Sequence, residues 1–150
     1  MRYFLDCEYN GFGGALLSLA LAPEDGGEEF YVTLVCGDPI HEWVERNVLP
    51  YMDHVPVGLQ SPRLGHEQAA MHLSAWLAGL SEAEIIADWP EDIRLFCDLL
   101  VIGPARIVPF PPLTFKLMRL PGFSTAANSA VPHNALHDAR ALREHYTHLE

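Results

Sequence analysis

The stretch "RYFLDCEYNG", residues 2–11, begins the sheet that the sequence predicts, and it carries an unusual pair of acids. Its aromatic and aliphatic residues suit a buried, pleated strand. Asp6 and Glu8 lie two positions apart, so the alternation of side chains along a strand places both carboxylates on the same face. Like charges on one face of a sheet repel each other and are costly to bury. The stretch therefore predicts a strand whose acidic pair needs an opposing charge.

The composition is that of a globular chain with a large excess of acid. Its 150 residues suffice for one domain, expected over residues 1–150, and 49% of them are hydrophobic and 19% charged. The net charge of −11 excludes a protein that holds nucleic acid by its own basic groups alone. Such a chain either avoids nucleic acid or uses bound cations to neutralise phosphate, although acidity also serves solubility by itself.

Apolar runs and cysteines predict the cellular location. No apolar run approaches the roughly 20 residues that a membrane helix needs, and the acidic residue at position 6 argues against a signal peptide. Cys7, Cys36 and Cys97 are widely spaced and flanked by apolar residues, which predicts buried free thiols in a reducing compartment. We therefore expect a cytoplasmic protein without membrane association.

Hydrophobic periodicity and turn signals divide the chain into strands followed by alternating helices and strands. Three strands form an antiparallel meander, and two more follow later in the chain: 2–9, 15–21, 29–35, 83–89 and 105–110. Helices are predicted at four places, with residues 101–132 otherwise loop or short helix: 40–50, 65–80, 90–101 and 134–149. This order predicts an α/β fold whose mixed five-stranded sheet joins an antiparallel meander to parallel strands and is flanked by helices.

Two further stretches carry acids or histidine where packing alone would not choose them. Asp88 ends a predicted strand and Asp92 falls in the first turn of the next helix, where carboxylates also serve the helix dipole. His133 and Asp138 are five residues apart, about 500° of helical rotation, so they converge only if His133 belongs to the incoming loop. Pro132 favours that loop and Asn134 can cap the helix. The alternative is an exposed histidine and a surface aspartate.

The order of these motifs resembles the DEDDh group of 3′–5′ exonucleases, the DnaQ-like and RNase T-like enzymes of the ribonuclease H-like superfamily. "FLDCEYNG" (4–11) looks like the first motif, "EDIRLF" (91–96) like the second, and "HNALHDAR" (133–140) like the third and most specific one. The stretch "WVERNVLP" (43–50) and the short chain further resemble a compact bacterial exoribonuclease branch. The resemblance extends from residue 2 to about residue 146 and implies a ribonuclease H-like fold.

The resemblance implies hydrolysis of RNA 3′ ends by two divalent cations, Mg²⁺ or Mn²⁺. By that resemblance Asp6 bridges both ions, Glu8 and Asp138 complete the ion that activates water, and Asp92 holds the other ion, partly through water. His133 is implied as the general base, a role that the ordinary histidine pKa of ~6.5 suits. Ions held in this way would neutralise the carboxylates and bridge to the substrate phosphate.

One position departs from the family pattern. Other members place Asn or another polar residue four positions before the aspartate of the second motif, and here that position is Asp88. Counting from "DIRLF" selects Asp92 as the ligand of the second motif. Asp88 is then either a rival ligand or a group that supports the ligands.

The resemblance also implies where the substrate is held. Asn10, Gly11 and Phe12 follow the first motif, in a loop that touches the terminal nucleotide in the family. We expect Phe12 or Trp89 to stack on a base, with ordinary packing as an equally open alternative for both. Five basic residues either line a phosphate path or are plain surface charge: Arg106, Lys116, Arg119, Arg140 and Arg143.

The expected partner is a single-stranded or overhanging RNA 3′ end, and the family implies a homodimer. One alternative is the same reaction on single-stranded DNA, which a contact to the 2′-hydroxyl would separate from RNA cleavage. Another is a catalytically silent relative that binds nucleic acid or protein, against which the complete set of carboxylates and His133 argues. A third, a ribonuclease H-like endonuclease, is disfavoured by the five-residue spacing between His133 and Asp138.

Overall fold

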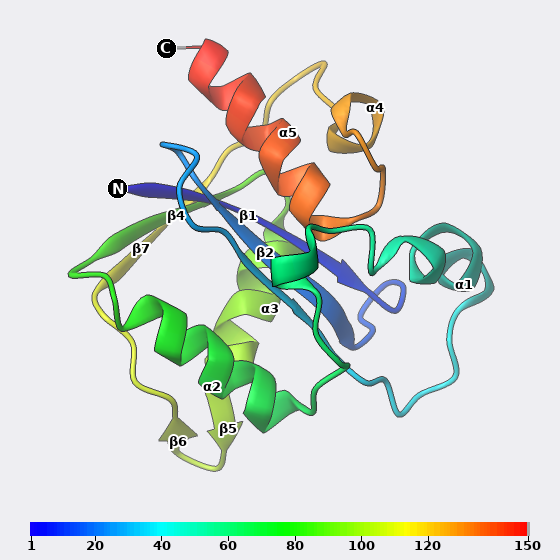
Figure 1. Ribbon diagram of the computed structural model, residues 1–150, viewed down its shortest axis with the longest axis vertical. Helices are drawn as coiled ribbons and strands as arrows, with labels where there is room; N and C mark the ends of the chain where they lie inside the picture. The colour runs from blue at the N-terminus through cyan, green and yellow to red at the C-terminus, as the bar shows by residue number, and fades with distance from the viewer. Residues whose placement is uncertain (150) are drawn as a thin grey trace.

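The computed structural model describes residues 1–149 and contains a mixed five-stranded sheet of order β3-β2-β1-β4-β7 (Figure 1). The first three strands are antiparallel neighbours: β1 (Arg2–Tyr9), β2 (Leu16–Pro23) and β3 (Phe30–Thr33). The other two run parallel to β1: β4 (Ala83–Ala87) and β7 (Leu113–Leu117). Because β1 and β4 are parallel neighbours, their C-terminal ends meet at the same edge of the sheet.

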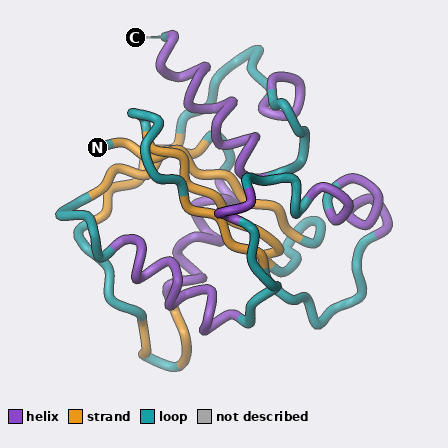
Figure 2. Tube along the Cα trace, viewed as in Figure 1, coloured by secondary structure: helices purple, strands orange, loops and turns teal. Residues whose placement is uncertain are grey.

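Helices cover both faces of this sheet (Figure 1). α5 (Ala135–His148) packs against β1 and β2 on one face, and α2 (His66–Leu77) and α3 (Pro90–Leu100) pack on the other. The remaining elements are short: α1 (Glu42–Asn47), η1 (Leu49–Tyr51), η2 (Val57–Leu59), β5 (Val101–Gly103), β6 (Arg106–Ile107) and α4 (Thr125–Asn128). Figure 2 shows that a long loop joins β3 to α1, which lies at the margin of the molecule.

The residues of β1 alternate between two hydrophobic cores. Tyr3, Leu5 and Cys7 pack in the core beneath α2 and α3, whereas Phe4 packs with residues of α5 in the core on the opposite face. Asp6 and Glu8 stand at even positions like Phe4, so alternation points them toward the α5 side. The acidic pair therefore lies at the end of an apolar row, next to the start of α5.

Two sequence-based predictions about elements and cysteines were wrong. The fifth strand of the sheet is β7, which falls in a stretch predicted as loop or short helix, and not residues 105–110. The prolines before β7 concealed it, but a proline at the start of an edge strand removes no ladder bond. Within 105–110 only Arg106 and Ile107 form a strand, paired with β5 in a separate hairpin. Of the three cysteines only Cys7 is buried, and Cys97 is exposed.

The antiparallel meander, the following parallel strands and the flanking helices confirm the predicted α/β fold class and are consistent with a ribonuclease H-like fold. The predicted helix over 40–50 is divided, because α1 ends at Asn47 and a 3₁₀ turn with Pro50 follows it. Among residues 1–149, every helix is too short or too polar to cross a membrane.

Candidate active site

Three segments far apart in the chain meet at the C-terminal end of β1. β1 contributes Asp6 and Glu8, and the junction of β4 with α3 contributes Asp88 and Asp92. The start of α5 contributes Asp138, and the loop before it contributes His133. All six chemistry-bearing side chains that the sequence singled out are therefore brought to one edge of the sheet, divided into two groups.

The first group consists of Asp6, Asp88 and Asp92, and one carboxylate oxygen from each residue lies within 4.8 Å of the other two. Pro90 fixes the first turn of α3, and Asp92 in that turn is only 2% exposed. Its Oδ1 accepts a hydrogen bond of 3.2 Å from the backbone N–H of Cys7. This bond fastens the start of α3 to β1, so Asp92 is held against Asp6, while Asp88 is half-buried beside them.

The second group consists of Glu8, His133 and Asp138, whose ligand atoms also lie within 4.8 Å of one another. His133 has φ +65° and stands in the loop before α5, the position that convergence with Asp138 requires. Asn134 caps α5, because its Oδ1 accepts from the backbone N–H groups of Leu136 and His137 at 3.0 and 3.3 Å. The left-handed backbone at His133 thus reverses the chain just ahead of the cap.

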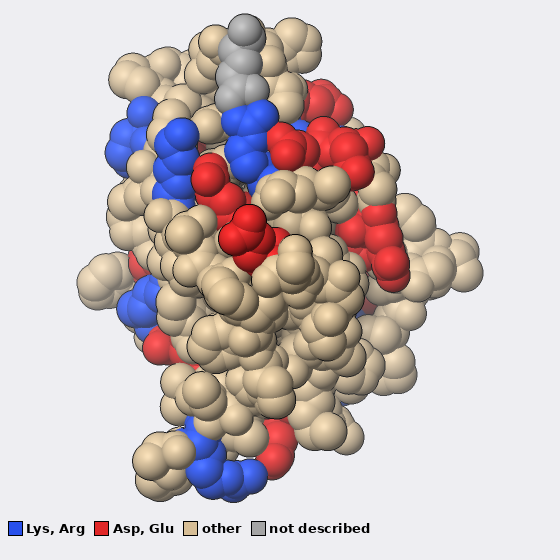
Figure 3. Space-filling model, turned by 90° about the vertical axis from the view of Figure 1, so that its left-hand side faces the viewer, with Lys and Arg blue, Asp and Glu red and all other residues tan. Residues whose placement is uncertain are grey.

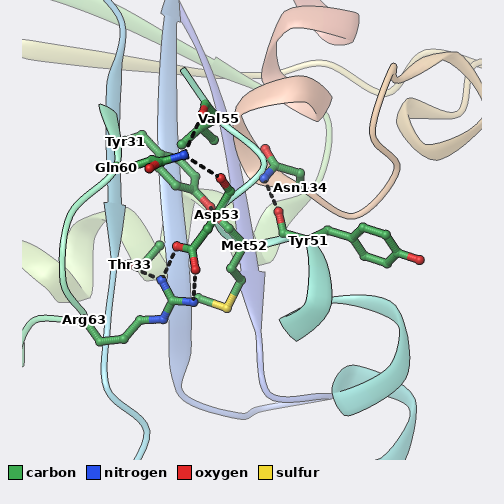
Figure 4. A network of polar contacts seen from close by, with 9 residues as sticks. All are labelled: Tyr31, Thr33, Tyr51, Met52, Asp53, Val55, Gln60, Arg63 and Asn134. Atoms are coloured by element: carbon green, nitrogen blue, oxygen red, sulfur yellow. Dashed lines mark hydrogen bonds and ion pairs between the residues drawn. The ribbon is translucent and has the colours of Figure 1, made fainter. Parts of the chain in front are cut away.

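A hydrogen-bonded segment next to α1 supports the start of α5 (Figure 4). The Asn134 side chain donates to the carbonyl oxygen of Tyr51 at 2.8 Å, and Tyr31 of β3 donates to the carbonyl oxygen of Met52 at 2.6 Å. Arg63 donates to both carboxylate oxygens of Asp53, at 2.7 and 3.1 Å. These contacts join the sheet, the 51–53 segment and the cap of α5, and thereby fix the loop that carries His133.

The carboxyl groups of both clusters resist ionisation in the protein without metal. Burial, followed by the charges of Asp92 and Glu8, raises the pKa of Asp6 well above its ordinary value. Burial and the charge of Asp138 raise the pKa of Glu8 to about 9. Burial and the charge of Asp88 raise the pKa of Asp92 to about 8. Burial also raises the pKa values of Asp88 and Asp138. Every shift has the direction expected where acids share one site without a cation.

The donor set suits hard divalent cations. Asp6 Oδ2 and Asp138 Oδ1 are buried oxygens without a hydrogen-bond partner among the described residues. Unpartnered buried acceptors are costly in a folded protein and call for a ligand. Mg²⁺ and Mn²⁺ prefer carboxylate oxygens, and a neutral histidine nitrogen is compatible with Mn²⁺. The two groups could therefore hold metal ions, one beside Asp6, Asp88 and Asp92 and one beside Glu8, His133 and Asp138.

A cavity of about 290 Å³ opens over four of these carboxylates, those of Asp6, Glu8, Asp88 and Asp92. Trp43 and Trp89 line it together with Tyr9 and Thr125. In sequence, Trp43 stands out only as part of the stretch 43–50, and its place at the site was not predicted. Its ring meets the His133 ring edge-on, with 4.9 Å between the centroids and 77° between the planes. Sequence offered no chemical signal for this contact, because it depends on how α1 folds back.

The loop after β1 divides the predicted substrate-binding residues into a structural group and an exposed one. Asn10 Oδ1 accepts from the His41 backbone N–H at 2.8 Å, and its Nδ2 donates to the Pro39 carbonyl oxygen at 2.9 Å. Both ends of this amide therefore hold the loop before α1. Gly11 has φ +75°, a conformation that glycine adopts without strain, and Phe12 is 99% exposed. Packing therefore does not explain why a phenylalanine stands at position 12.

Of the five basic residues predicted to line a phosphate path, one lies beside the site. Arg140 pairs with Glu29 and Arg106 with Glu67. Lys116 bonds to the Tyr146 hydroxyl, and Arg143 to the carbonyl oxygen of Pro23. The guanidinium of Arg119, by contrast, lies over the ring of Trp89 at 5.2 Å and donates to the Asp88 carbonyl oxygen.

Comparison with known protein families and with curated proteins finds no match to this chain. The structure itself therefore supplies what can be stated here: a ribonuclease H-like topology, and buried acidic groups that could hold metal ions.

Proposed function

We propose that the chain is a divalent-metal-dependent 3′–5′ exoribonuclease of the DEDDh type, related to the DnaQ-like and RNase T-like enzymes, and that residues 1–150 form one catalytic domain. The observation that carries the proposal is the convergence of five carboxylates and His133 in two groups at the end of β1, where Asp6, Glu8, Asp88 and Asp92 line a cavity. Buried acids with raised pKa values in a cleft are typical of catalytic sites. Charge repulsion among these acids does not stabilise the fold, whereas the same carboxylates can serve as ligands when cations bind.

The carboxylates would hold two ions, Mg²⁺ or Mn²⁺. Asp6, Asp88 and Asp92 would hold one, and Glu8 with Asp138 the other, with Asp6 of the first group and Glu8 of the second both on β1. Bound ions supply a positive charge that polarises the phosphoryl oxygen and lowers the pKa of a water molecule. Asp88, the departure from the family pattern, would act as a ligand beside Asp92 because its oxygen lies within the same 4.8 Å group.

His133 would accept the proton of the attacking water. Its loop position places the imidazole beside Glu8 and Asp138, while Asn134 keeps the following helix fixed. As water attacks phosphorus, the proton passes to an imidazole nitrogen and the bond to the leaving oxygen breaks. Asp138, within the same group of ligand atoms, would stabilise the resulting imidazolium.

The substrate would be a single-stranded or overhanging RNA 3′ end held by few contacts. Trp89 and Phe12 are exposed at 46% and 99%, which supports stacking on bases. The net charge of −11 agrees with binding through cations at the catalytic centre and not through a basic surface. A homodimer and a cytoplasmic location stay predictions.

The proposal is tested by digesting RNA and DNA oligonucleotides labelled at either end. With Mg²⁺ or Mn²⁺, a 5′ label should pass through a ladder of products shortened one nucleotide at a time, and a 3′ label should be released as a mononucleotide at once. EDTA should stop both. Internal fragments at early times would indicate an endonuclease instead. Tight binding of RNA without products in any metal would favour a catalytically silent relative.

A further inference from the structure

A second hollow lies on the other side of Trp89. It has a volume of about 380 Å³ and is lined by Trp89, Pro90, Glu91 and Arg119. Trp89 also lines the cavity over the carboxylates, so the two spaces share one wall. The second space contains none of the residues of the two acidic groups. It therefore offers room for a part of the substrate next to the part that reacts.

Arg119 is placed in this hollow with most of its donors unused. Its guanidinium lies over the Trp89 ring at 5.2 Å and gives one hydrogen bond, of 3.4 Å, to the Asp88 carbonyl oxygen. Among residues 1–149 it forms no ion pair with a carboxylate, whereas Arg63 and Arg140 both do. A guanidinium has five N–H donors in a planar fork that matches the oxygens of a phosphate. Stacking on an indole leaves the edge of that fork accessible.

Glu91 is the acid in this hollow, and its carboxylate is already occupied. Its Oε1 accepts from the Tyr9 hydroxyl at 3.1 Å and from Trp89 Nε1 at 3.3 Å. Its Oε2 lies 3.7 Å from a guanidinium nitrogen of Arg94. These bonds fix the indole of Trp89 and partly neutralise the acid. Glu91 thus orients the wall between the two spaces, and Arg119 supplies the positive charge of the second one.

We propose that Arg119 binds the phosphate one nucleotide to the 5′ side of the scissile phosphate, while Trp89 separates the reacting nucleotide from the next one. The inference rests on the proposed function and deepens it, because it makes a strand with at least two consecutive charged phosphates the preferred substrate. Arg119 is a substrate-binding residue in this arrangement. A charge-assisted pair of this kind contributes about tenfold to binding.

The test uses pentanucleotides in which one phosphate is replaced by an uncharged methylphosphonate. At the position one step 5′ of the first scissile phosphate, the replacement should lower the wild-type kcat/KM about tenfold. In Arg119→Gln the all-phosphate strand should already be about tenfold slower, and the replacement should change the rate less than twofold. Arg119→Lys keeps the charge without the fork and should lie between. Arg106→Gln, a change beyond the far end of α3, should match the wild type.

Equal sensitivity of the wild type and Arg119→Gln to the methylphosphonate would overturn the inference while leaving the exonuclease proposal intact. Failure of the wild type to cleave any strand would instead remove the proposed function. A binding measurement by fluorescence anisotropy separates the two, made with Mg²⁺ and Asp6→Asn so that the strand stays whole. There, adding Arg119→Gln should reduce the slope of log K against log salt by about 0.7, and an unchanged slope would count against the phosphate contact.

Discussion

Asp53 and Asp92 are the same residue type in one molecule, and their environments shift the carboxyl pKa in opposite directions. Arg63 donates to both oxygens of Asp53 and lowers its pKa (Figure 4). Asp92 is buried beside Asp6 and Asp88, and its pKa is raised to about 8, chiefly by burial. One acid is supplied with a cation by the chain itself, and the other is surrounded by more acid.

The same contrast separates whole regions of the protein. Arg2 pairs with Glu24 and Arg140 with Glu29, each at 2.6 Å, near the N-terminal ends of β1 and β3. On the face drawn in Figure 3, basic and acidic side chains lie close together near the end of α5. The fold can therefore place arginines against carboxylates, and at the C-terminal end of β1 it does not. A metal ion from solution could supply the missing positive charge, which is the physical basis for proposing metal ions there.

The strongest way to break this contrast is Asp6→Asn. If Asp6 helps to hold both ions, the variant should lose nuclease activity by about a thousandfold or more, since a metal ion supplies several kcal/mol in the transition state. At pH 8 without metal the same variant should melt at a higher temperature than the wild type, because asparagine is neutral, whereas Asp6 must either stay charged among other acids or take up a proton on folding. Initial rates with an end-labelled RNA and thermal melts in EDTA check both effects. Activity close to that of the wild type would remove the catalytic assignment.

Asp92→Asn and Asp88→Asn serve as the matched pair for that experiment. Asp92 is the more buried residue and accepts the Cys7 N–H bond, so its variant should show the larger loss. Abolished activity in Asp88→Asn with retained activity in Asp92→Asn would make Asp88 the ligand of the second motif. Both variants replace a carboxylate with an amide, at positions four residues apart. They therefore have the same net charge and can be compared directly.

A smaller loss is expected from His133→Ala. Removing a general base typically costs 10²–10⁴-fold, and the carboxylates and their ions remain in this variant. The rate should fall about a hundredfold, with little change in metal-induced stabilisation. The steepness of the rate increase toward neutral pH should also be lost, which a pH–rate profile measures. A profile unchanged in shape and height would assign the proton transfer to another group.

The fold class and the local placement of each acidic group could be predicted from sequence because they depend on local patterns, whereas the meeting of the three segments was implied by the family resemblance. Alternation along residues 2–9 orients Asp6 and Glu8 without any tertiary information. Pro132 and Asn134 likewise predict a loop histidine ahead of a capped helix, as the structure shows at His133. The confirmed mixed sheet, with an antiparallel meander followed by parallel strands, follows from the three early strands and the later alternation of helices and strands.

Other features depend on contacts between distant segments, and sequence gave no signal for them. β7 was mistaken for a loop because the prolines before it hid a short, exposed edge strand. Trp43 reaches His133 only because of the path taken by the loop between β3 and α1, which Asn10 fastens. Sequence also could not distinguish Arg119 from the other basic residues, because the partners that bind those residues lie far from them in the sequence.

Metal and pH should act together on stability at the acidic site. The pKa values of Glu8 and Asp92 are raised to about 9 and 8, so the folded metal-free protein keeps protons that the unfolded chain loses near pH 4. Proton binding by these two groups therefore contributes fully to the free energy of unfolding below about pH 4, and the contribution is lost as the pH rises toward 9. Mg²⁺ or Mn²⁺ at 100 times Kd should restore about 2.7 kcal/mol, roughly 5–10 °C in Tm. Melts at pH 5 to 9, with metal and with EDTA, test the prediction. A Tm that ignores both metals at pH 8 would contradict it.

Arg63→Gln should produce the smallest effect and the opposite dependence on pH. The pair with Asp53 is partly exposed, at 34% and 62% of the two side chains, so its loss should cost at most about 1 kcal/mol at pH 7. Arg63 lowers the pKa of Asp53, so the pair stabilises the fold above the unfolded value near 4 and is lost as the pH falls through the folded value. The free energies of unfolding of the two proteins, measured in urea, should therefore converge at acid pH once Asp53 is protonated in the folded protein. A difference that persisted or grew there would mean that Arg63 acts through its bond to Thr33 instead of its charge.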